Sequence, residues 1–324
     1  MKKIVDDTRL IFKCCSLYYQ DQVGQKQICE LLGLSRPTVS RMLKSGREQG
    51  IVKIEVVNPD NVIYGELEHQ LEKKFHLNEV VIVDTEPLKH DTKYINSKIG
   101  HAALRFLSRT LTDKDYVGVS MGLTIQNVVR ADCPIDEEID CIFVPLVGGV
   151  NEGQGKLEIH ANYLARAFAE RFGGRFEQFF SPALFSRQEV LKGFLQENVN
   201  QRILRMYDRL DVIILGIGVL DEKHSTLIQS GYITREQMKV FSELGAVGDI
   251  ALRYFDIEGN TENFEKFNER VAGIALPQMT KVPKRIGIAG GKQKAAPVLG
   301  AIRGGYINVL ITDVACAEKL LNYK

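Results

Sequence analysis

The chain has 324 residues, of which 44% are hydrophobic and 26% are charged, and its formal net charge is +1. This length and composition are those of a soluble globular protein with one large domain or two smaller ones, and the charge excludes a polybasic coat for nucleic acid. The charge is uneven, because residues 1–60 hold ten Lys or Arg and seven Asp or Glu, whereas the rest of the chain holds 32 and 34. A basic excess at the amino-terminal end is the direction expected of a DNA-binding region.

The amino-terminal segment starts like a secretory signal, but Asp6, Asp7, Arg9 and Lys13 interrupt the apolar stretch that a signal requires. No window reaches the ~18 uninterrupted apolar residues of a membrane-spanning helix. The six cysteines form no Cys-x-x-Cys pair and the six histidines form no cluster, so no disulfide framework or metal site is predicted. The sequence therefore predicts a cytoplasmic protein without a metal or cofactor.

Two helices are predicted first, over residues 8–19 and 25–32, where apolar side chains recur at helical spacing. Residues 25–44 then meet the requirements of a helix-turn-helix unit, because Cys29 is a small residue for the helix crossing and Gly33 suits the turn. The apolar residues predicted to be buried in this unit are Ile28, Leu32, Leu34, Val39 and Met42.

The third helix begins at an N-cap. Ser35 is a preferred capping residue, and Pro37 is tolerated in the first turn because the N–H that proline lacks has no partner there. The helix is expected to run to about Glu48 and to stop at Gly50. The alternating residues 51–57 predict a short strand that would form a small wing.

A polar stripe on the third helix is the candidate DNA-binding surface. Arg36, Ser40 and Lys44 are spaced by four and share one face, where Arg and Ser reach base edges or phosphates and Lys reaches a phosphate. The alternative is an ordinary solvated helix face. The residues predicted to contact DNA are Gln25, Ser35, Arg36, Pro37, Thr38, Ser40, Arg41 and Lys44. One such helix buries too little surface to be selective, so a single copy predicts a homo-oligomer.

The turn-like cluster Asn58-Pro59-Asp60 predicts a boundary between a DNA-binding domain over 1–57 and a second domain over 58–324. Residues 61–77 follow as an amphipathic connecting helix with apolar residues every four positions, at Leu67, Leu71 and Phe75. This helix either forms a dimer seam or packs on the domain that follows.

From Glu79 onward, short apolar runs alternate with helical segments. The predicted strands are residues 80–84, 116–120, 141–147, 211–218, 285–291 and 307–313. Near-continuous apolar strands separated by helices predict a doubly wound, mostly parallel α/β domain with both faces of the sheet covered.

Polar residues and glycines at the strand ends are the candidate effector site. Ser120, Gly122 and Thr124 stand between a strand and a helix, where an anion can bind, or they form an ordinary loop. Gly148 and Gly149 open a flexible loop. The remaining candidates lie closer to the carboxyl terminus.

Asp249 and Asp256 lie beside glycines, where they would accept hydrogen bonds from sugar hydroxyls or cap turns. Lys292 and Lys294 follow Gly290-Gly291 in the first turn of a predicted helix. A positive charge opposes the helix dipole at that end, so these lysines indicate a bound anion, with a solvated lysine pair as the alternative.

Many segments resemble, in order and spacing, the SorC/DeoR-type sugar-binding transcriptional regulators. They are "LGLSRPTVSRMLKSGREQGIVKI" near the start and "LGIGVL", "SGYIT", "GAVGDI" and "AGGKQKAAPVLGAIRGGYINVLITD" further on. The resemblance implies a winged helix-turn-helix joined to an effector domain similar to ribose-phosphate isomerase and glucosamine-phosphate deaminase. It also implies a dimer or tetramer, and a phosphorylated sugar or related metabolite as effector. The contacts it implies are Gly122, Thr124, Gly148, Gly149, Asp249 and Lys294.

One position departs from part of the family. Some members carry a lysine directly before the Gly-Gly pair, where it could form an imine with an aldehyde effector, but this chain has Val147 there. The predicted function is a transcriptional regulator, a repressor rather than an activator, whose operator binding is controlled by the effector. No catalytic triad, Walker or Gly-x-Gly-x-x-Gly motif is present. The alternatives are a sugar-phosphate isomerase or deaminase that uses Asp249, Asp256 and Lys294, and an architectural DNA-binding protein without induction.

Overall fold

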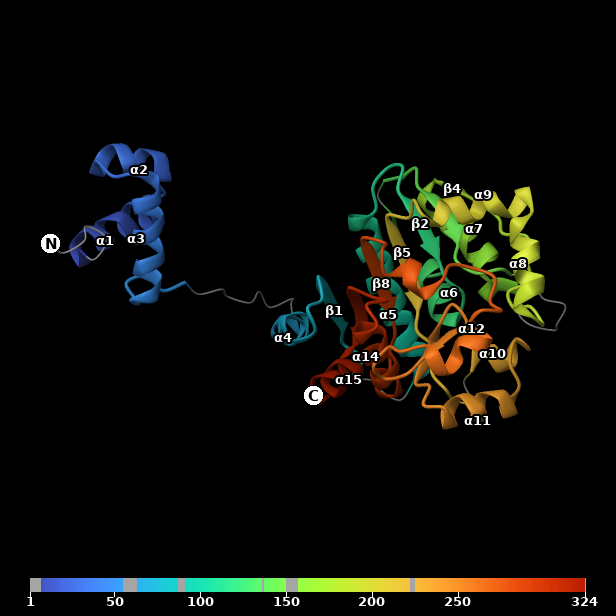
Figure 1. Cartoon of the computed structure of the whole chain (residues 1–324). Helices are drawn as coiled ribbons and strands as arrows, with labels where there is room; N and C mark the ends of the chain where they lie inside the picture. Colours follow the sequence, from blue (N-terminus) through green and yellow to red (C-terminus); the bar gives the residue numbers. More distant parts are fainter. Residues whose placement is uncertain are drawn as a thin grey trace. The chain divides into compact units, whose positions relative to one another are not determined.

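A computed structural model describes residues 7–54, 63–86, 91–135, 137–149, 157–221 and 225–323. The chain forms two compact units, Met1–Val62 and Ile63–Lys324 (Figure 1). The first unit consists of α1 (Thr8–Cys15), a π-helical turn η2 (Ser16–Gln20), α2 (Gln25–Leu32) and α3 (Arg36–Glu48).

Local sequence sets the ends of these helices. Gly33 ends α2 in the left-handed conformation with φ of 63°, and the Ser35 hydroxyl accepts the N–H of Thr38 at the start of α3. The predicted α2, turn and α3 are confirmed. The predicted strand is wrong over residues 51–54, because residues 51 and 52 form a bend and residues 53 and 54 have no regular structure. Residues 55–57 lie outside the described part of the chain.

The core of the first unit contains Ile28, Val39 and Met42, as predicted, while Leu32 and Leu34 are partly buried. The close approach of α1 to α3 depends on Gly46. A Cβ atom on Gly46 would lie 2.3 Å from the Cys15 sulfur, so only glycine lets α1 pack here.

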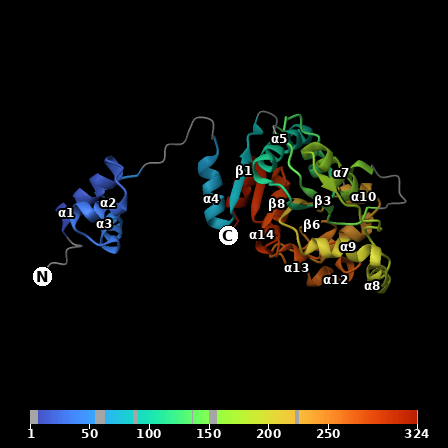
Figure 2. The ribbon, with the colours of Figure 1, turned by 90° about the horizontal axis from the view of Figure 1, so that it is seen from above.

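The second unit is a seven-stranded sheet with helices on both faces (Figures 1 and 2). Its strands are β1 (Glu79–Val83), β2 (Tyr116–Val119), β3 (Ile142–Pro145), β4 (Arg175–Phe176), β5 (Val212–Gly216), β8 (Lys284–Ile288) and β9 (Val309–Asp313), with a separate hairpin of β6 (Gly248–Ile250) and β7 (Arg253–Phe255). Its helices are α4 (Gly65–Phe75), α5 (Thr92–Thr110), α6 (Leu123–Val129), α7 (Ala161–Phe172), α8 (Gln188–Gln196), α9 (Asn198–Tyr207), α10 (Thr226–Gln229), α11 (Arg235–Glu243), α12 (Glu265–Asn268), α13 (Leu276–Met279), α14 (Ala295–Arg303) and α15 (Val314–Leu321). Short 3₁₀ turns include η4 (Leu157–Ile159), η5 (Glu262–Phe264) and η6 (Lys292–Lys294).

The strand order is β1-β9-β8-β5-β2-β3-β4, and the pairs in this sheet are parallel. Burial on both faces explains the continuous apolar runs, since Val212 and Ile214 of β5 face one core and Ile213 and Leu215 face the other. The six predicted strands are confirmed. The short edge strand β4 and the β6–β7 hairpin were not predicted, because two or three residues carry too little periodicity to be recognised.

Helix α4 covers the outer edge of β1 (Figure 2). The carboxylates of Glu72 and Glu68 accept the N–H groups of Val80 and Ile82, at 2.9 and 2.8 Å. Leu71 is fully buried in the core of the same unit. The connecting helix therefore packs on the domain that follows, the second of the two predicted alternatives, and it protects a sheet edge that would otherwise expose unpaired amides.

Candidate functional site

The exposed face of α3 carries the predicted DNA-binding residues. Side chains of Ser35, Arg36, Pro37, Ser40, Arg41 and Lys44 are exposed, whereas Gln25 and Thr38 are partly buried. The ammonium of Lys44 lies 3.7 Å from the Glu48 carboxylate, and both side chains are more than half exposed. Such an exposed pair contributes little to stability and leaves the lysine available to a phosphate.

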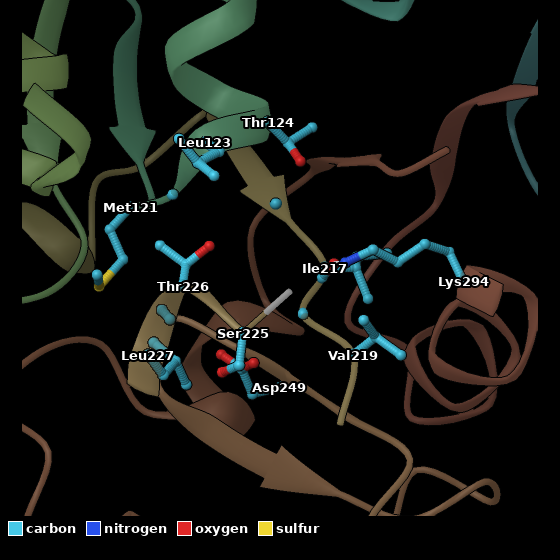
Figure 3. A pocket seen from close by; sticks show the side chains of 14 residues that line it. Met121, Leu123, Thr124, Ile217, Val219, Ser225, Thr226, Leu227, Asp249 and Lys294 are labelled. Carbon is cyan, nitrogen blue, oxygen red and sulfur yellow. Dashed lines mark hydrogen bonds between the residues drawn. The ribbon is translucent and has the colours of Figure 1, made fainter. Parts of the chain in front are cut away.

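A pocket lies at the carboxyl ends of β2 and β5, beside the β6–β7 hairpin (Figure 3). Its empty space is about 580 Å³ when the part of its mouth that is open to solvent is included. The lining residues are Met121, Gly122, Leu123, Thr124, Gly216, Ile217, Gly218, Val219, Ser225, Thr226, Leu227, Asp249, Ala251 and Lys294. Ligands of parallel α/β sheets bind at this end of the strands.

Lys294 is one of two charged side chains among the described residues that line the pocket. It ends η6, directly before α14, and its Nζ donates a 2.5 Å hydrogen bond to the carbonyl oxygen of Ile217 (Figure 3). The lysine thus reaches from the β8–α14 connection to the end of β5. Its neighbour Lys292 is exposed and does not line this pocket.

Asp249 is the other charged residue that lines the pocket, and its position requires a glycine at residue 218. The Gly218 N–H donates to the Asp249 carbonyl at 2.8 Å, and the Leu252 N–H donates to the Asp249 carboxylate at 3.3 Å. A Cβ atom on Gly218 would lie only 1.8 Å from the Asp249 Oδ1. The carboxylate therefore occupies space that any other residue at 218 would fill.

The hairpin that presents Asp249 has a strained turn. Ile250 pairs with Arg253, and the two residues between them, Ala251 and Leu252, both have positive φ values of 48° and 68°. This conformation favours glycine or asparagine, so it stores strain next to the pocket. Strained backbone of this kind is concentrated at functional sites.

Burial shifts both charged groups toward neutrality. It raises the pKa of Asp249 to about 6, partly opposed by the Lys294 charge and the Leu252 amide. It lowers the pKa of Lys294 to about 8, partly opposed mainly by the Asp249 charge. Near pH 7 the pocket therefore holds an ammonium and a carboxylate, which suit an anionic group and a hydroxyl group of one ligand.

The structure brings together Gly122, Thr124, Asp249 and Lys294 of the predicted effector residues. Ser120 is fully buried beside them, where its hydroxyl accepts the N–H of Gly216 and ties β2 to β5. It does not line the pocket.

Gly148 and Gly149 lie apart from the lining residues. Their N–H groups donate to the carbonyls of Ala272 and Ser181, at 2.8 and 3.0 Å. A Cβ atom on Gly148 would lie 2.6 Å from the Ser181 carbonyl oxygen, so close backbone packing accounts for this glycine.

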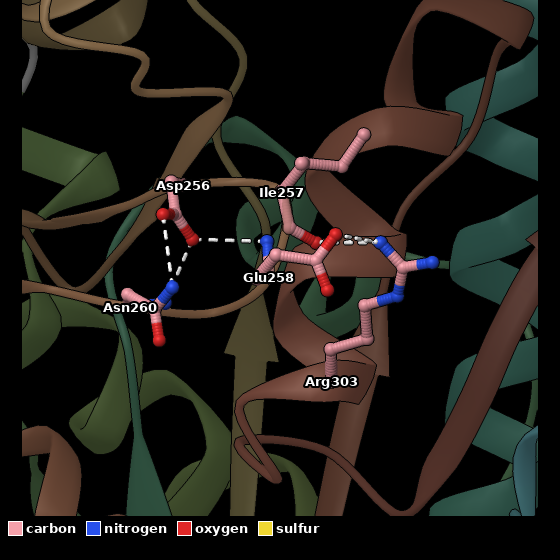
Figure 4. A network of polar contacts seen from close by, with 5 residues as sticks. All are labelled: Asp256, Ile257, Glu258, Asn260 and Arg303. Carbon is pink, nitrogen blue, oxygen red and sulfur yellow. Dashed lines mark hydrogen bonds and ion pairs between the residues drawn. The ribbon is translucent and has the colours of Figure 1, made fainter.

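Asp256 caps a turn outside the pocket (Figure 4). Its carboxylate accepts the N–H groups of Glu258 and Asn260 at 2.9 and 2.8 Å and the Asn260 side-chain amide at 3.1 Å. Arg303 pairs with Glu258 on the other side of this turn at 2.5 Å. Of the two readings of Asp256 from the sequence, the turn cap is the one that the structure shows.

Sequence reasoning missed several lining residues. Ser225, Thr226 and Leu227 enter from the start of α10, where the Ser225 hydroxyl accepts the Ile228 N–H. The segment "LGIGVL" contributes Gly216 to Val219, and its glycines were the available signal. No group of three or more His, Cys, Asp or Glu side chains within the described ranges is arranged to hold a metal ion.

Known proteins share this architecture and much of this sequence. A family model for a sugar-binding domain (Sugar-bind) matches residues 63–322. The sorbitol operon regulator of Klebsiella pneumoniae is 33% identical over 326 residues, which cover 98% of each chain. The chain belongs to the SorC/DeoR-type sugar-binding transcriptional regulators.

Other members of the family match this chain in sequence and in fold. The deoxyribonucleoside regulator of Bacillus subtilis (strain 168) is 30% identical over 318 residues, 97% of each chain. The crystal structure of full-length SorC from Klebsiella pneumoniae matches with a TM-score of 0.72 and 32% identity, over 98% of this chain and 100% of that one. The sugar-binding domain of a transcriptional repressor from Vibrio fischeri matches with a TM-score of 0.70 and 25% identity, over 79% of this chain and 98% of that one.

Membership of this family makes the protein a DNA-binding transcriptional regulator with a sugar-related effector. The sheet-containing unit, Ile63–Lys324, corresponds to the sugar-binding domain that the family model matches. None of the described helices is long and apolar enough to cross a bilayer.

Proposed function

We propose that this regulator is a cytoplasmic repressor, and that a phosphorylated sugar or polyol controls its operator binding by occupying the pocket at the ends of β2 and β5. The observation that carries the proposal is the Lys294–Asp249 pair in that pocket. A phosphate group is an acceptor for the ammonium, and a sugar hydroxyl is a donor for the carboxylate. The names of the relatives, a sorbitol operon regulator and a deoxyribonucleoside regulator, support an effector of this class.

The DNA-binding half of the proposal rests on α3. Arg36, Ser40 and Arg41 are exposed on a helix whose start is fixed by the Ser35 cap, so they are positioned to enter a major groove. Lys44 would contact a phosphate. A single recognition helix reads one half-site, so we expect a homodimer or homotetramer on a palindromic operator.

We further propose that the protein performs no catalysis. Of the three groups that could serve an isomerase or deaminase as acid and base, Asp249 and Lys294 line the pocket, but Asp256 caps a turn outside it. An assay for sugar-phosphate turnover tests this point, and measurable isomerisation or deamination would contradict it.

The experiment that tests the regulator proposal combines two measurements. Thermal shift is recorded with sorbitol 6-phosphate, 2-deoxyribose 5-phosphate and ribose 5-phosphate, with unphosphorylated sorbitol and inorganic phosphate as controls, because a ligand of the native state raises Tm. The operator is selected from a random duplex pool. We expect one of the sugar phosphates to raise Tm and to release the operator, whereas failure of every one to do either would overturn the proposal.

A further inference from the structure

Thr226 projects from a wall of the effector pocket that the sequence did not mark. It is the first residue of α10, and it lines the pocket together with its neighbours Ser225 and Leu227 (Figure 3). These neighbours are 5% and 7% exposed, and the carbonyl oxygen of Thr226 accepts the N–H of Ser230 at 2.9 Å. The backbone of Thr226 is therefore held in place before a ligand arrives, which reduces the entropy lost on binding.

The hydroxyl of Thr226 is available to a ligand, whereas that of Ser225 serves the fold. The Ser225 hydroxyl accepts the N–H of Ile228 at 3.3 Å and caps α10. Thr226 is half-buried, and its hydroxyl has no hydrogen-bond partner among the described residues. Of the two hydroxyls on this wall, that of Thr226 is thus the one free to contact a bound molecule.

Thr226 and Lys294 lie on opposite sides of the pocket. Figure 3 shows Thr226 on the side that carries Met121 and Leu227, whereas Lys294 enters from the other side. An anionic group bound at Lys294 leaves the rest of the effector to extend toward Thr226. The neighbouring side chains of Met121 and Leu227 are apolar, so a polar group of the effector on this side is oriented by the threonine.

We propose that Thr226 is a specificity-determining residue whose hydroxyl forms a hydrogen bond with a hydroxyl group of the sugar or polyol, on the side away from its phosphate. This inference rests on the proposed function of the pocket. A threonine hydroxyl both donates and accepts, so it pairs with a sugar hydroxyl in either direction. A ligand with a hydrogen atom in place of that hydroxyl is disfavoured, because the threonine would lose water without gaining a partner.

Two substitutions in the full-length protein separate the hydroxyl of Thr226 from its volume. Thr226→Val keeps the shape and removes the hydroxyl, whereas Thr226→Ser keeps the hydroxyl and removes the methyl group. Calorimetry is performed with sorbitol 6-phosphate, 2-deoxyribose 5-phosphate and ribose 5-phosphate. For the one that the wild-type protein binds most tightly, we expect about fivefold weaker binding in Thr226→Val and at most about twofold in Thr226→Ser. A threonine that only filled space would show the opposite order, because serine leaves a gap and valine does not.

Thr280→Val is the matched control. Thr280 is also half-buried, but its hydroxyl donates to the Pro277 carbonyl at 3.0 Å and it does not line the pocket. Its substitution should leave the affinity for the sugar phosphate unchanged. If Thr226→Val fails to fold, Thr226→Ala takes its place, since alanine also lacks the hydroxyl and is a better helix former.

Each outcome has one meaning. Wild-type affinity in the variant without the hydroxyl, or an equal loss in Thr226→Ser, would overturn the inference and leave the proposed function intact. An equal loss in Thr280→Val would do the same. No binding of any of the three sugar phosphates to the wild-type protein would overturn the proposed function itself, and this inference with it.

Discussion

The two units of this regulator build their functional surfaces in opposite ways. In the amino-terminal unit, most of the candidate DNA contacts occupy consecutive turns of one helix, α3, and point to solvent. In the sugar-binding unit, Lys294 and Asp249 are 45 positions apart in the sequence and meet only because η6 and the β6–β7 hairpin converge on the end of β5. A contiguous site can be read from helical periodicity, whereas a convergent site depends on which strand ends lie side by side.

The units also differ in what their glycines do. Gly33 ends α2 in a local turn, as the sequence pattern of a helix-turn-helix predicts. Gly218 serves a distant carboxylate, since a side chain there would overlap Asp249. A change in the first unit should therefore alter DNA binding alone, and a change in the second should alter effector response alone.

Removal of the first unit is the strongest test of this separation. A truncated protein that starts at Asn61 should fold, bind the sugar phosphate and oligomerise, but lose all operator affinity. The Vibrio fischeri domain, which corresponds to 79% of this chain, was solved as a sugar-binding domain by itself. Gel-shift and calorimetry measure the two activities, and an insoluble product or one without effector binding would contradict the proposed boundary.

Gly218→Ala should abolish most of the effector response. The new methyl group would displace the Asp249 carboxylate, and loss of its hydrogen bond to the effector should cost roughly 1.5–3 kcal/mol, which is roughly 10- to 150-fold in affinity. Gly193→Ala is the matched control, since its Cβ meets no atom within 4 Å and α8 tolerates alanine. Calorimetric affinity equal to wild type in the Gly218 variant would show that the effector does not depend on Asp249.

Lys294→Met should weaken effector binding by roughly 10- to 150-fold, because a hydrogen bond to a charged group contributes roughly 1.5–3 kcal/mol. The methionine keeps most of the apolar stem, so folding and operator binding should persist, and the operator should need far more sugar phosphate for release. Lys292→Met serves as the control, since this lysine is exposed outside the pocket. Equal losses in both variants would place the phosphate elsewhere.

Arg36→Ala and Arg41→Ala should each weaken operator binding by about 1–3 kcal/mol, or roughly 5- to 150-fold, if the lost contact is a bidentate base contact. Effector affinity should stay unchanged, because both side chains belong to the first unit. Fluorescence anisotropy at fixed salt measures the effect. Wild-type operator affinity in both variants would exclude α3 as the recognition helix.

The smallest expected effect is on the pH dependence of effector binding. Burial lowers the pKa of Lys294 to about 8, and a phosphate requires its charged form, so affinity should fall as the pH rises above 8. At pH 9 the loss relative to pH 7 should be about 10-fold. Lys294→Arg retains its charge and should show no such loss, and an alkaline decline that persists in it would assign the titration to another group.

The sequence by itself determined the class of each unit. The cap at Ser35, the turn at Gly33 and the spacing of Ile28, Val39 and Met42 are local features, so they predicted α2 and α3 correctly. The apolar runs of β1, β2, β3, β5, β8 and β9 likewise follow from burial on both sheet faces. Burial constrains every residue of an element, so the spacing of apolar residues shows which faces of the element are buried.

Only the tertiary structure decided the composition of the candidate site. It placed Lys294 on the carbonyl of Ile217 in the pocket, and it placed Asp256 in a turn cap outside the pocket. These outcomes depend on packing between segments that are far apart in the chain. The residue pattern within one segment does not identify the distant segment with which it packs.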